Sequence, residues 1–518
     1  MYLTQSLHRA ATLHPKRTAT VHGARRRSYA ELAERVARLA GALQSIGLQP
    51  DDRIGMLALN SDRYLEYYLG SYWAGCVVNP ANIRWSAAEI AFSLDDCETR
   101  VLIVDDQFLP MVPELRQRAA CLTRLIYAGD GATPEGMLSF EDMIAASAPI
   151  PDTGRSGDDL AGVFYTGGTT GFPKGVMLGH GGLYINALTI AAEGATQEGS
   201  TGLHAAPMFH LACIGVMNAM LVHCCTHVFL PAFAPGAVLQ TIEKESIATA
   251  LLVPTMVQMT VDHPDADRHD LSSLRNVLYG ASPISEAVID RAMAKLPNAN
   301  FFQAYGMTEL SPAATMLTPF YHTPEGRKQG KIRSAGRPTF CAEVRIFNED
   351  DQEVARGEVG EIVVRGPGVM LGYWKRPDDT RAALRGGWMH TGDAGRMDQD
   401  GYVFIVDRIK DMIVTGGENV YSAEVENAVQ QHPAVAACAV IGIPDDKWGE
   451  TVHAVVVLKA GANATAQQIA EHCKGLIANY KVPRSSVFVD TLPLSGAGKV
   501  LKNKLREPFW AGRERQVG

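Results

Sequence analysis

Hydrophobic positions along this chain follow two different periods. Between residues 28 and 48, Leu32, Val36 and Leu39 recur at helical spacing behind Ser28, which predicts an amphipathic helix that begins at a capping serine. Short runs that are apolar throughout follow at intervals and are separated by helical stretches. Such runs are typical of strands in sheets that helices cover on both faces. The predicted strands are 53–59, 101–104, 162–165, 227–230, 250–253, 276–279 and 301–304.

The pattern changes in the last third of the chain. Three short apolar runs with Gly-rich turns predict an antiparallel set at 343–347, 361–365 and 402–406. The elements predicted after it are a helix at 423–432, strands at 436–442 and 453–458, and a helix at 466–478. We therefore expect a large α/β N-terminal domain over residues 1–408, with layered sheets, helices and a small β-rich subdomain. A small α+β C-terminal domain is expected over residues 409–518.

Composition and charge restrict the function classes. The chain has 518 residues, of which 46% are hydrophobic and 20% charged, as in an ordinary globular protein, so wholesale disorder is excluded. Lys and Arg number 48 against 56 Asp and Glu, and the resulting net charge of −8 disfavours nucleic acid as a partner.

The cysteines and the apolar runs of the sequence indicate in which cellular compartment the protein is expected. Nine scattered cysteines without a CxxC pair give no support for a zinc ribbon and are typical of a reducing compartment. The most apolar long stretch, residues 211–222, is too short to span about 30 Å of hydrocarbon, and the start of the chain lacks a secretory signal. We expect a cytoplasmic protein without a transmembrane segment.

The strongest chemical signal is the run Tyr165-Thr-Gly-Gly-Thr-Thr-Gly-Phe-Pro-Lys174-Gly175, which is expected to follow a strand and precede a helix. Glycines let the backbone approach a polyanion, threonine hydroxyls donate to phosphate oxygens, and a lysine adds charge. The Walker spacing is not met, because Lys174 follows Pro173. A flexible turn is the plainer alternative for such a composition. The candidate phosphate-binding residues are Thr166, Gly167, Gly168, Thr169, Thr170, Gly171 and Lys174.

A second signal is the run Tyr305-Gly306-Met307-Thr308-Glu309. A carboxylate beside a hydroxyl suits Mg²⁺ bound together with substrate phosphates, and an aromatic ring can stack on a purine. Taken alone, such a run is more often a surface turn. Its combination with the phosphate loop favours a nucleotide site.

In this order the motifs resemble those of the AMP-forming acyl-CoA synthetases of the adenylate-forming superfamily, and the resemblance extends from about residue 10 to residue 508. The phosphate loop of that family reads roughly Thr-Ser-Gly-Thr-Thr-Gly-x-Pro-Lys-Gly, and Gly167 stands where Ser is usual. The resemblance implies ATP, Mg²⁺ and coenzyme A as cofactor and co-substrates. It also implies that Tyr305 stacks on adenine, Thr308 meets the α-phosphate and Glu309 holds Mg²⁺.

The resemblance assigns further nucleotide contacts. It places the backbone of Gly280, Ala281 and Ser282 beside adenine and the acyl chain, although a plain strand-to-helix turn would also explain Gly and Pro there. Asp393, after a tight turn, would accept the ribose hydroxyls, or it simply fixes its own turn. Arg408 would meet the ribose or a phosphate.

The resemblance also implies a moving C-terminal lid. Lys410 occupies the hinge position, where a charged linker residue is otherwise merely solvated. Lys499, on a Gly-rich loop, is the implied adenylation lysine. The backbone of Gly416, Gly417 and Glu418 would line the coenzyme A channel.

His210 is the remaining candidate, beside the acyl pocket in a gating or carboxylate-orienting role. A core histidine at a helix start is the alternative. The neighbours Ala212, Cys213 and Gly215 are small, which leaves room for a long or bulky acyl group or serves close helix packing.

The implied function is a ligase that forms acyl-AMP and pyrophosphate and then acyl-CoA and AMP. We expect a small-molecule carboxylic acid, by slight preference a medium- or long-chain fatty acid. The alternatives are an aryl-CoA ligase of the coumarate or benzoate type and a free-standing adenylation enzyme that loads a carrier protein. A luciferase-like oxygenase and a non-enzymatic nucleotide sensor with this fold are further rivals. A homodimer is left open.

Overall fold

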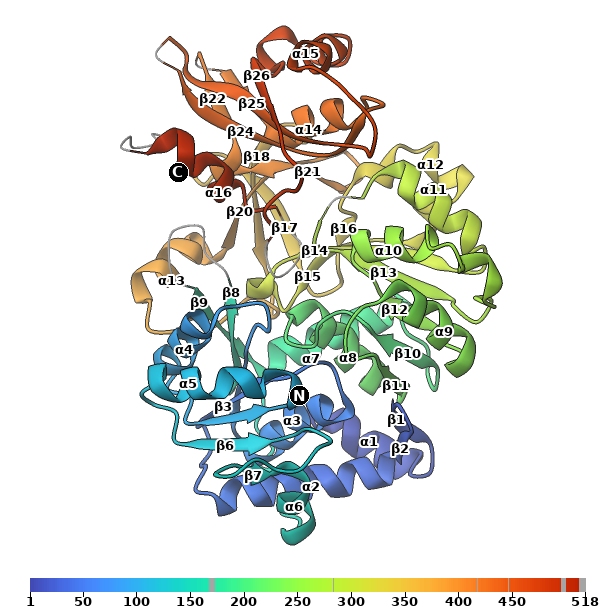
Figure 1. The fold of residues 1–518 in the computed structure, drawn as a ribbon, viewed down its shortest axis with the longest axis vertical. Coiled ribbons are helices and arrows are strands. Elements are labelled where there is room, and N and C mark those ends of the chain that lie inside the picture. The colour runs from blue at the N-terminus through green and yellow to red at the C-terminus, as the bar shows by residue number, and fades with distance from the viewer. Residues whose placement is uncertain (167–172, 283, 417, 446, 495–499, 512–518) are drawn as a thin grey trace. The chain divides into compact units, whose positions relative to one another are not determined.

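The structure is a computed structural model and describes residues 1–166, 173–282, 284–416, 418–445, 447–494 and 500–511. The chain forms two compact units (Figure 1). Unit 1 comprises Met1–Val344 and Val364–Met389, and unit 2 comprises Arg345–Val363 and His390–Gly518. The predicted domain boundary between residues 408 and 409 lies within unit 2 and stays a prediction.

The larger sheet of unit 1 has nine strands among the described residues. Its central strands are parallel, and its two ends are antiparallel. In spatial order the strands are β16 (Arg337–Pro338), β15 (Ala313–Leu317), β14 (Asn300–Gly306), β13 (Asn276–Gly280), β12 (Thr249–Leu251), β10 (Thr201–His204), β11 (Thr226–Phe229), β1 (Thr18–His22) and β2 (Arg25–Ser28).

Both faces of this sheet are buried, as the continuous apolar runs predict. Successive strand residues point to opposite faces, so Val277 packs into one hydrophobic cluster and Leu278 into another. The first cluster includes residues of α9 (Pro235–Glu245), α10 (Pro254–Val261) and α11 (Glu286–Lys295). The second includes residues of α7 (His180–Ala192) and α8 (Leu211–Val222).

The second sheet of unit 1 has eight strands within the described ranges. In spatial order they are β19 (Gly372–Tyr373), β9 (Lys174–Gly179), β8 (Leu160–Thr166), β4 (Val77–Pro80), β3 (Arg53–Leu57), β5 (Val101–Val104), β6 (Arg124–Tyr127) and β7 (Leu138–Ser139). All residues of β4 and β5 are buried. The other helices of unit 1 are α1 (Gln5–Leu13), α2 (Tyr29–Ser45), α3 (Asp62–Ala74), α4 (Ala87–Asp96), α5 (Val112–Arg118), α6 (Phe140–Ala146), α12 (Pro324–Arg327) and α13 (Pro377–Ala383).

The helix predicted from Ser28 onward is confirmed as α2, and its first turn and buried face contain the features that predicted it. The Ser28 side chain accepts from the Glu31 backbone N–H, and the Glu31 carboxylate accepts from the Ser28 backbone, which is a complete capping box. Its buried stripe includes Leu32, Val36 and Leu39.

Unit 2 carries most of a four-stranded sheet and a five-stranded sheet within the described residues. The strands of the first are β17 (Glu343–Phe347), β18 (Val359–Arg365), β20 (Met389–Met397) and β21 (Val403–Arg408). Those of the second are β23 (Glu418–Val420), β22 (Ile413–Thr415), β25 (Gly449–Leu458), β24 (Val435–Asp445) and β26 (Ser485–Phe488). The helices are α14 (Ser422–Gln430), α15 (Ala466–Lys474) and α16 (Lys502–Trp510).

The core of unit 2 lies between the five-stranded sheet and two helices. Val452, Ala454 and Val456 alternate along β25 and pack with Val425 of α14 and Ile469 of α15. The α/β and α+β classes therefore agree with the prediction. No helix in the described ranges is both long and apolar enough to cross a membrane.

Candidate active site

The ends of the predicted phosphate loop lie on two paired strands. Strands β8 and β9 are antiparallel, and Thr166 stands opposite Lys174. The expectation that a helix follows the loop was wrong, because Lys174 begins strand β9 and the next helix starts at His180. The five candidates between these ends lie outside the described residues, namely Gly167, Gly168, Thr169, Thr170 and Gly171.

Lys174 has two partners that the sequence analysis did not identify. Its Nζ lies 3.1 Å from Oδ2 of Asp379 and 5.2 Å from the centre of the Tyr373 ring. The Lys174 ammonium holds the pKa of the Asp379 carboxyl below its usual value. Little in the sequence singles out Asp379 as a partner of Lys174, because it resembles an ordinary acidic residue in the first turn of a helix.

Tyr373 also contacts Glu309. Its hydroxyl donates to Oε1 of Glu309 at 2.9 Å, and Glu309 is 5% exposed. Burial, and then the negative charge of Glu309, raise the pKa of the Tyr373 hydroxyl, so it stays a hydrogen-bond donor. One tyrosine therefore contacts both Lys174 and Glu309, two of the residues predicted to handle phosphate and Mg²⁺.

Glu309 belongs to a short turn that follows β14. Tyr305 lies in β14 opposite Thr315 of β15 and is 9% exposed. Gly306 comes next, where a Cβ atom would lie 1.9 Å from the carbonyl oxygen of Pro312, so the backbone contact requires glycine. Met307 precedes the 3₁₀ turn that begins at Thr308, and the Thr308 side chain is half-buried.

Gly280 ends the neighbouring strand β13. It pairs with Ala304, and a Cβ atom on it would lie 2.2 Å from the Ala304 carbonyl oxygen. Ala281 has a φ of +66°, a left-handed conformation that costs a non-glycine residue on the order of 1 kcal/mol or more. Ser282 follows and is half-buried. These residues and Tyr305 share the carboxyl edge of the parallel strands, where α/β sheets bind ligands.

His210 caps the helix that it precedes. Its Nδ1 accepts from the backbone N–H of Ala212 at 3.3 Å. Gly215 lies one turn further on, and a Cβ atom there would be 2.8 Å from Cδ of Pro312. At least one of the small residues of α8 therefore serves close packing, which weakens the sequence argument for a roomy acyl pocket at this helix.

Unit 2 brings Asp393 and Arg408 together. They are register partners on β20 and β21, and Nε of Arg408 lies 3.4 Å from Oδ1 of Asp393. Asp393 is 9% exposed and lies within a strand, directly after Gly392, which has a φ of +70°. Lys410 follows in a 3₁₀ turn, where burial lowers the pKa of its ammonium.

The predicted coenzyme A segment contacts Trp448. The N–H of Gly416 donates to the carbonyl oxygen of Trp448 at 2.8 Å, and a Cβ atom on Gly416 would lie 2.7 Å from Cε3 of Trp448. The guanidinium of Arg484 lies 4.8 Å from the centre of the Trp448 ring. Glu418 is exposed at the start of β23. Gly417 and Lys499 lie outside the described residues.

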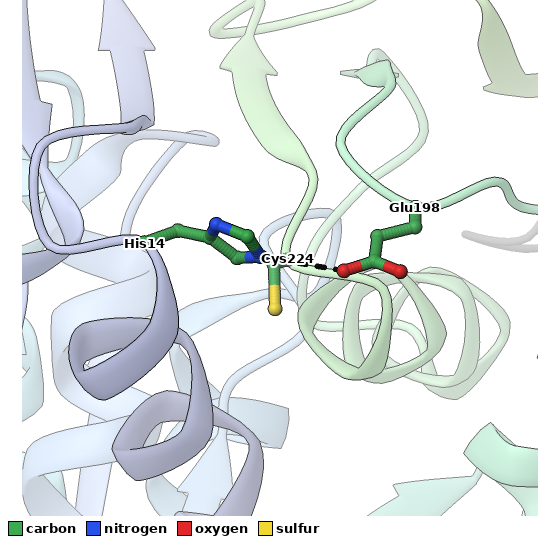
Figure 2. A group of neighbouring side chains, drawn as sticks. All are labelled: His14, Glu198 and Cys224. Atoms are coloured by element: carbon green, nitrogen blue, oxygen red, sulfur yellow. Dashed lines mark hydrogen bonds and ion pairs between the residues drawn. The ribbon is translucent and has the colours of Figure 1, made fainter.

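A separate cluster lies at the amino ends of β10 and β11, the opposite edge of that sheet. Figure 2 shows His14, Glu198 and Cys224 side by side, with Nε2 of His14 3.3 Å from Oε1 of Glu198. Arg9 donates to Sγ of Cys224 at 3.1 Å and lies 3.8 Å from the Glu198 carboxylate. A guanidinium thus supplies the positive charge in this cluster, which ties α1 to the sheet.

Comparison with known proteins identifies the family. A family model described as AMP-binding enzyme matches residues 7–374, and one described as AMP-binding enzyme C-terminal domain matches residues 424–499. A feruloyl-CoA synthase from Amycolatopsis sp is 41% identical over 508 residues, which cover 97% of this chain and 98% of that protein. The medium/long-chain-fatty-acid–CoA ligase FadD8 of Mycobacterium tuberculosis is 35% identical over 510 residues, which cover 94% of this chain and 86% of that protein.

A solved structure supports the same conclusion. ATP-bound MatB from Rhodopseudomonas palustris matches with a TM-score of 0.88 and 31% identity, over 98% of this chain and 99% of that one. The predicted family, fold class and enzyme class are confirmed. The chain belongs to the AMP-binding enzyme family and is an AMP-forming acyl-CoA synthetase, a carboxylate–CoA ligase of the adenylate-forming superfamily.

Proposed function

We propose that unit 1 binds the triphosphate of ATP through Lys174, Thr308 and Glu309 during adenylation. A carboxylate oxygen of the substrate attacks the α-phosphorus and expels pyrophosphate, which leaves an acyl-AMP. The coenzyme A sulfur then attacks the acyl carbonyl, loses its proton and expels AMP. The observation that carries this assignment is the contact of Tyr373 with both Lys174 and Glu309.

The residues around Glu309 fit a magnesium ion. Mg²⁺ prefers one or two carboxylates combined with substrate phosphates, and the Tyr373 hydroxyl donates a hydrogen bond to Oε1 of the Glu309 carboxylate. When bound, the ion neutralises negative charge on the phosphates. Tyr305, with Gly280, Ala281 and Ser282, would hold adenine at the same edge of the sheet.

Unit 2 supplies the second group of proposed contacts. Asp393 accepts the ribose hydroxyl protons, and Arg408 lies beside it to meet the ribose or a phosphate. We assign the hinge to Lys410, the adenylation lysine to Lys499 and the lid to residues 409–518. This arrangement gives each half-reaction its own position of the lid, because the lysine must leave before the thiol channel forms.

The substrate is an aryl-propenoic acid of the ferulate type in this proposal. The support is the 41% identity to a feruloyl-CoA synthase over nearly the full length of both chains. The small apolar residues after His210 and the lack of an evident charged residue there favour a fatty acid, but Gly215 uses its small size to pack against Pro312.

A medium- or long-chain fatty acid is the second candidate, supported by the 35% identity to FadD8. One extra methylene in an apolar pocket changes binding by about 1–3 kcal/mol, so a few residues of the acyl pocket decide between the two acids. Loading of a carrier protein in place of coenzyme A is a third possibility, which the same assay tests.

The deciding experiment measures pyrophosphate release with ferulate, coumarate, benzoate, octanoate and palmitate. We expect the largest kcat/KM with ferulate or coumarate. A larger kcat/KM with octanoate or palmitate would contradict the aryl proposal. Repeating the assay with coenzyme A or an acyl-carrier protein as acceptor identifies the thiol, and failure to release pyrophosphate with every acid would contradict adenylation itself.

A further inference from the structure

The positive charge of Lys174 is already paired within unit 1. Its Nζ lies 3.1 Å from Oδ2 of Asp379 and 5.2 Å from the Tyr373 ring centre. The pair is partly solvated, since the Lys174 and Asp379 side chains are 27% and 40% exposed. The Asp379 carboxylate and the face of the Tyr373 ring therefore both hold the Lys174 ammonium.

Asp379 has a second cation within reach. Nη1 of Arg376 lies 3.5 Å from the same Oδ2 atom that contacts Lys174. When the ammonium departs, the carboxylate keeps a positive neighbour. Breaking the Lys174–Asp379 contact therefore costs little free energy, as expected for an ion pair in which Lys174 can exchange Asp379 for another anion.

Tyr373, in contrast, is fixed by its backbone. It pairs with Val176 of β9, and the next residue, Trp374, donates its N–H to the carbonyl oxygen of Gly175 at 2.8 Å. The ring is thus anchored to the strand that begins with Lys174, while its hydroxyl reaches Glu309 after β14. Tyr373 connects side chains that two different sheets position.

We propose that Asp379 is the resident counter-ion of Lys174, which the ammonium leaves to bind the triphosphate, while Tyr373 keeps the ammonium in register with Glu309. This inference rests on the proposed function, in which Lys174 binds phosphate. Tyr373 acts here as a positioning residue.

The proposal predicts the direction in which one substitution changes ATP affinity and another changes the reaction rate. The Asp379 carboxylate competes with the triphosphate for Lys174 and repels it, so removal of its charge strengthens ATP binding. A partly exposed ion pair limits this gain to about two- to fivefold. Removal of the Tyr373 hydroxyl leaves the ring under the ammonium but deprives the buried Glu309 carboxylate of a donor, which lowers the rate of the chemical step rather than ATP affinity.

The first test measures the Kd for ATP by calorimetry in the full-length enzyme. We expect Asp379→Asn to lower Kd about two- to fivefold. The matched control Asp378→Asn removes the same charge from the adjacent residue, which pairs with Arg381, and leaves Kd unchanged. The same gain from Asp379→Asn in a Lys174→Ala background, or no gain in the wild-type background, would overturn the counter-ion role.

The second test separates kcat from KM. We expect Tyr373→Phe to lower kcat for pyrophosphate release about tenfold, with the calorimetric Kd for ATP within about twofold of wild type. Tyr127→Phe removes a comparable hydroxyl–carboxylate bond, to Asp106, and serves as the control with unchanged kcat. An unchanged kcat in Tyr373→Phe overturns the positioning role.

Lys174→Ala distinguishes failure of the proposed phosphate site from failure of the roles of Asp379 and Tyr373. If Lys174→Ala binds ATP as tightly as wild type, the proposed phosphate site is wrong. If Lys174→Ala weakens binding while Asp379→Asn and Tyr373→Phe are neutral, the phosphate site stands and only the inference about its neighbours fails.

Discussion

Asp393 and Arg408 stand opposite one another on antiparallel strands β20 and β21, with Nε of Arg408 3.4 Å from Oδ1 of Asp393. The carboxylate is nearly buried, whereas the Arg408 side chain is 45% exposed. An acceptor and a donor are thus held side by side, which suits the proposed contacts with the ribose and a phosphate.

This pair gives a first prediction. Asp393→Ala should raise the KM for ATP about tenfold, because about 1.4 kcal/mol is lost when a buried carboxylate no longer accepts the ribose hydroxyls. Steady-state kinetics at saturating acid measures it. An unchanged KM in a variant with wild-type thermal stability would remove Asp393 from the nucleotide site.

A second prediction separates the half-reactions. Lys499→Ala should lower the rate of acyl-AMP formation by 10²–10³-fold, about 2.7–4 kcal/mol of barrier, because a cation at the α-phosphate is lost. Thioester formation from chemically prepared acyl-AMP should stay near the wild-type rate, and rapid-quench assays follow each step. Equal loss in both steps would show that Lys499 is not dedicated to adenylation.

A third prediction concerns the coenzyme A segment. Gly416 has a φ of +61°, and an added Cβ atom would lie 2.7 Å from the Trp448 indole. Gly416→Ala should therefore displace that ring and raise the KM for coenzyme A, with pyrophosphate release unchanged. Gly461→Ala is the matched control, since its φ is +76° and nothing lies within 4 Å of the added atom. Equal kinetics in the two variants would contradict a role in thiol binding.

A fourth prediction follows from buried histidines. Burial lowers the pKa of His204 to about 3, and that of His180 and His322 to about 4. The unfolded chain takes up protons on these rings near pH 6.5, whereas the folded chain does not. These groups therefore leave the free energy of unfolding unchanged above pH 6.5 and lower it progressively as the pH falls toward 4. Burial also lowers the pKa of His227, and each such group destabilises unit 1 by about 1.4 kcal/mol per pH unit in that window.

Thermal unfolding midpoints between pH 7.5 and 5 check this slope. His322→Gln should flatten the curve, because one of the buried groups no longer titrates. Parallel curves for the variant and wild type would contradict the assignment. His14→Gln is a control, because His14 is a half-buried partner of the exposed Glu198 and lies outside the fully buried set.

Local signals made much of the fold predictable. Ser28 and Glu31 cap α2 within one turn, and the continuous apolar runs correctly indicated strands buried on both faces. The error at Lys174 arose because a Gly-rich loop after a strand fits a helix or a second strand equally well. Only the pairing of Thr166 with Lys174 decides it, and that pairing is not local chemistry.

The neighbours of Lys174 could not be predicted from the sequence, because they too depend on how strands pair. Tyr373 lies in a two-residue strand, which has no periodicity to recognise, and its role depends on pairing with Val176. Asp379 resembles any acidic residue in a first helical turn. By contrast, Glu309 and Asp393 stand in motifs whose order along the chain resembles that of a known family, and this resemblance singled them out as candidates.

The late position of β19 in the chain has a consequence during synthesis. A nascent polypeptide that ends before residue 373 has already made Lys174 and Glu309 but lacks the ring and the carboxylate that hold the ammonium. Lys174 therefore gains its aromatic and acidic neighbours only after synthesis has passed Asp379, and a product truncated earlier carries Lys174 and Glu309 without them.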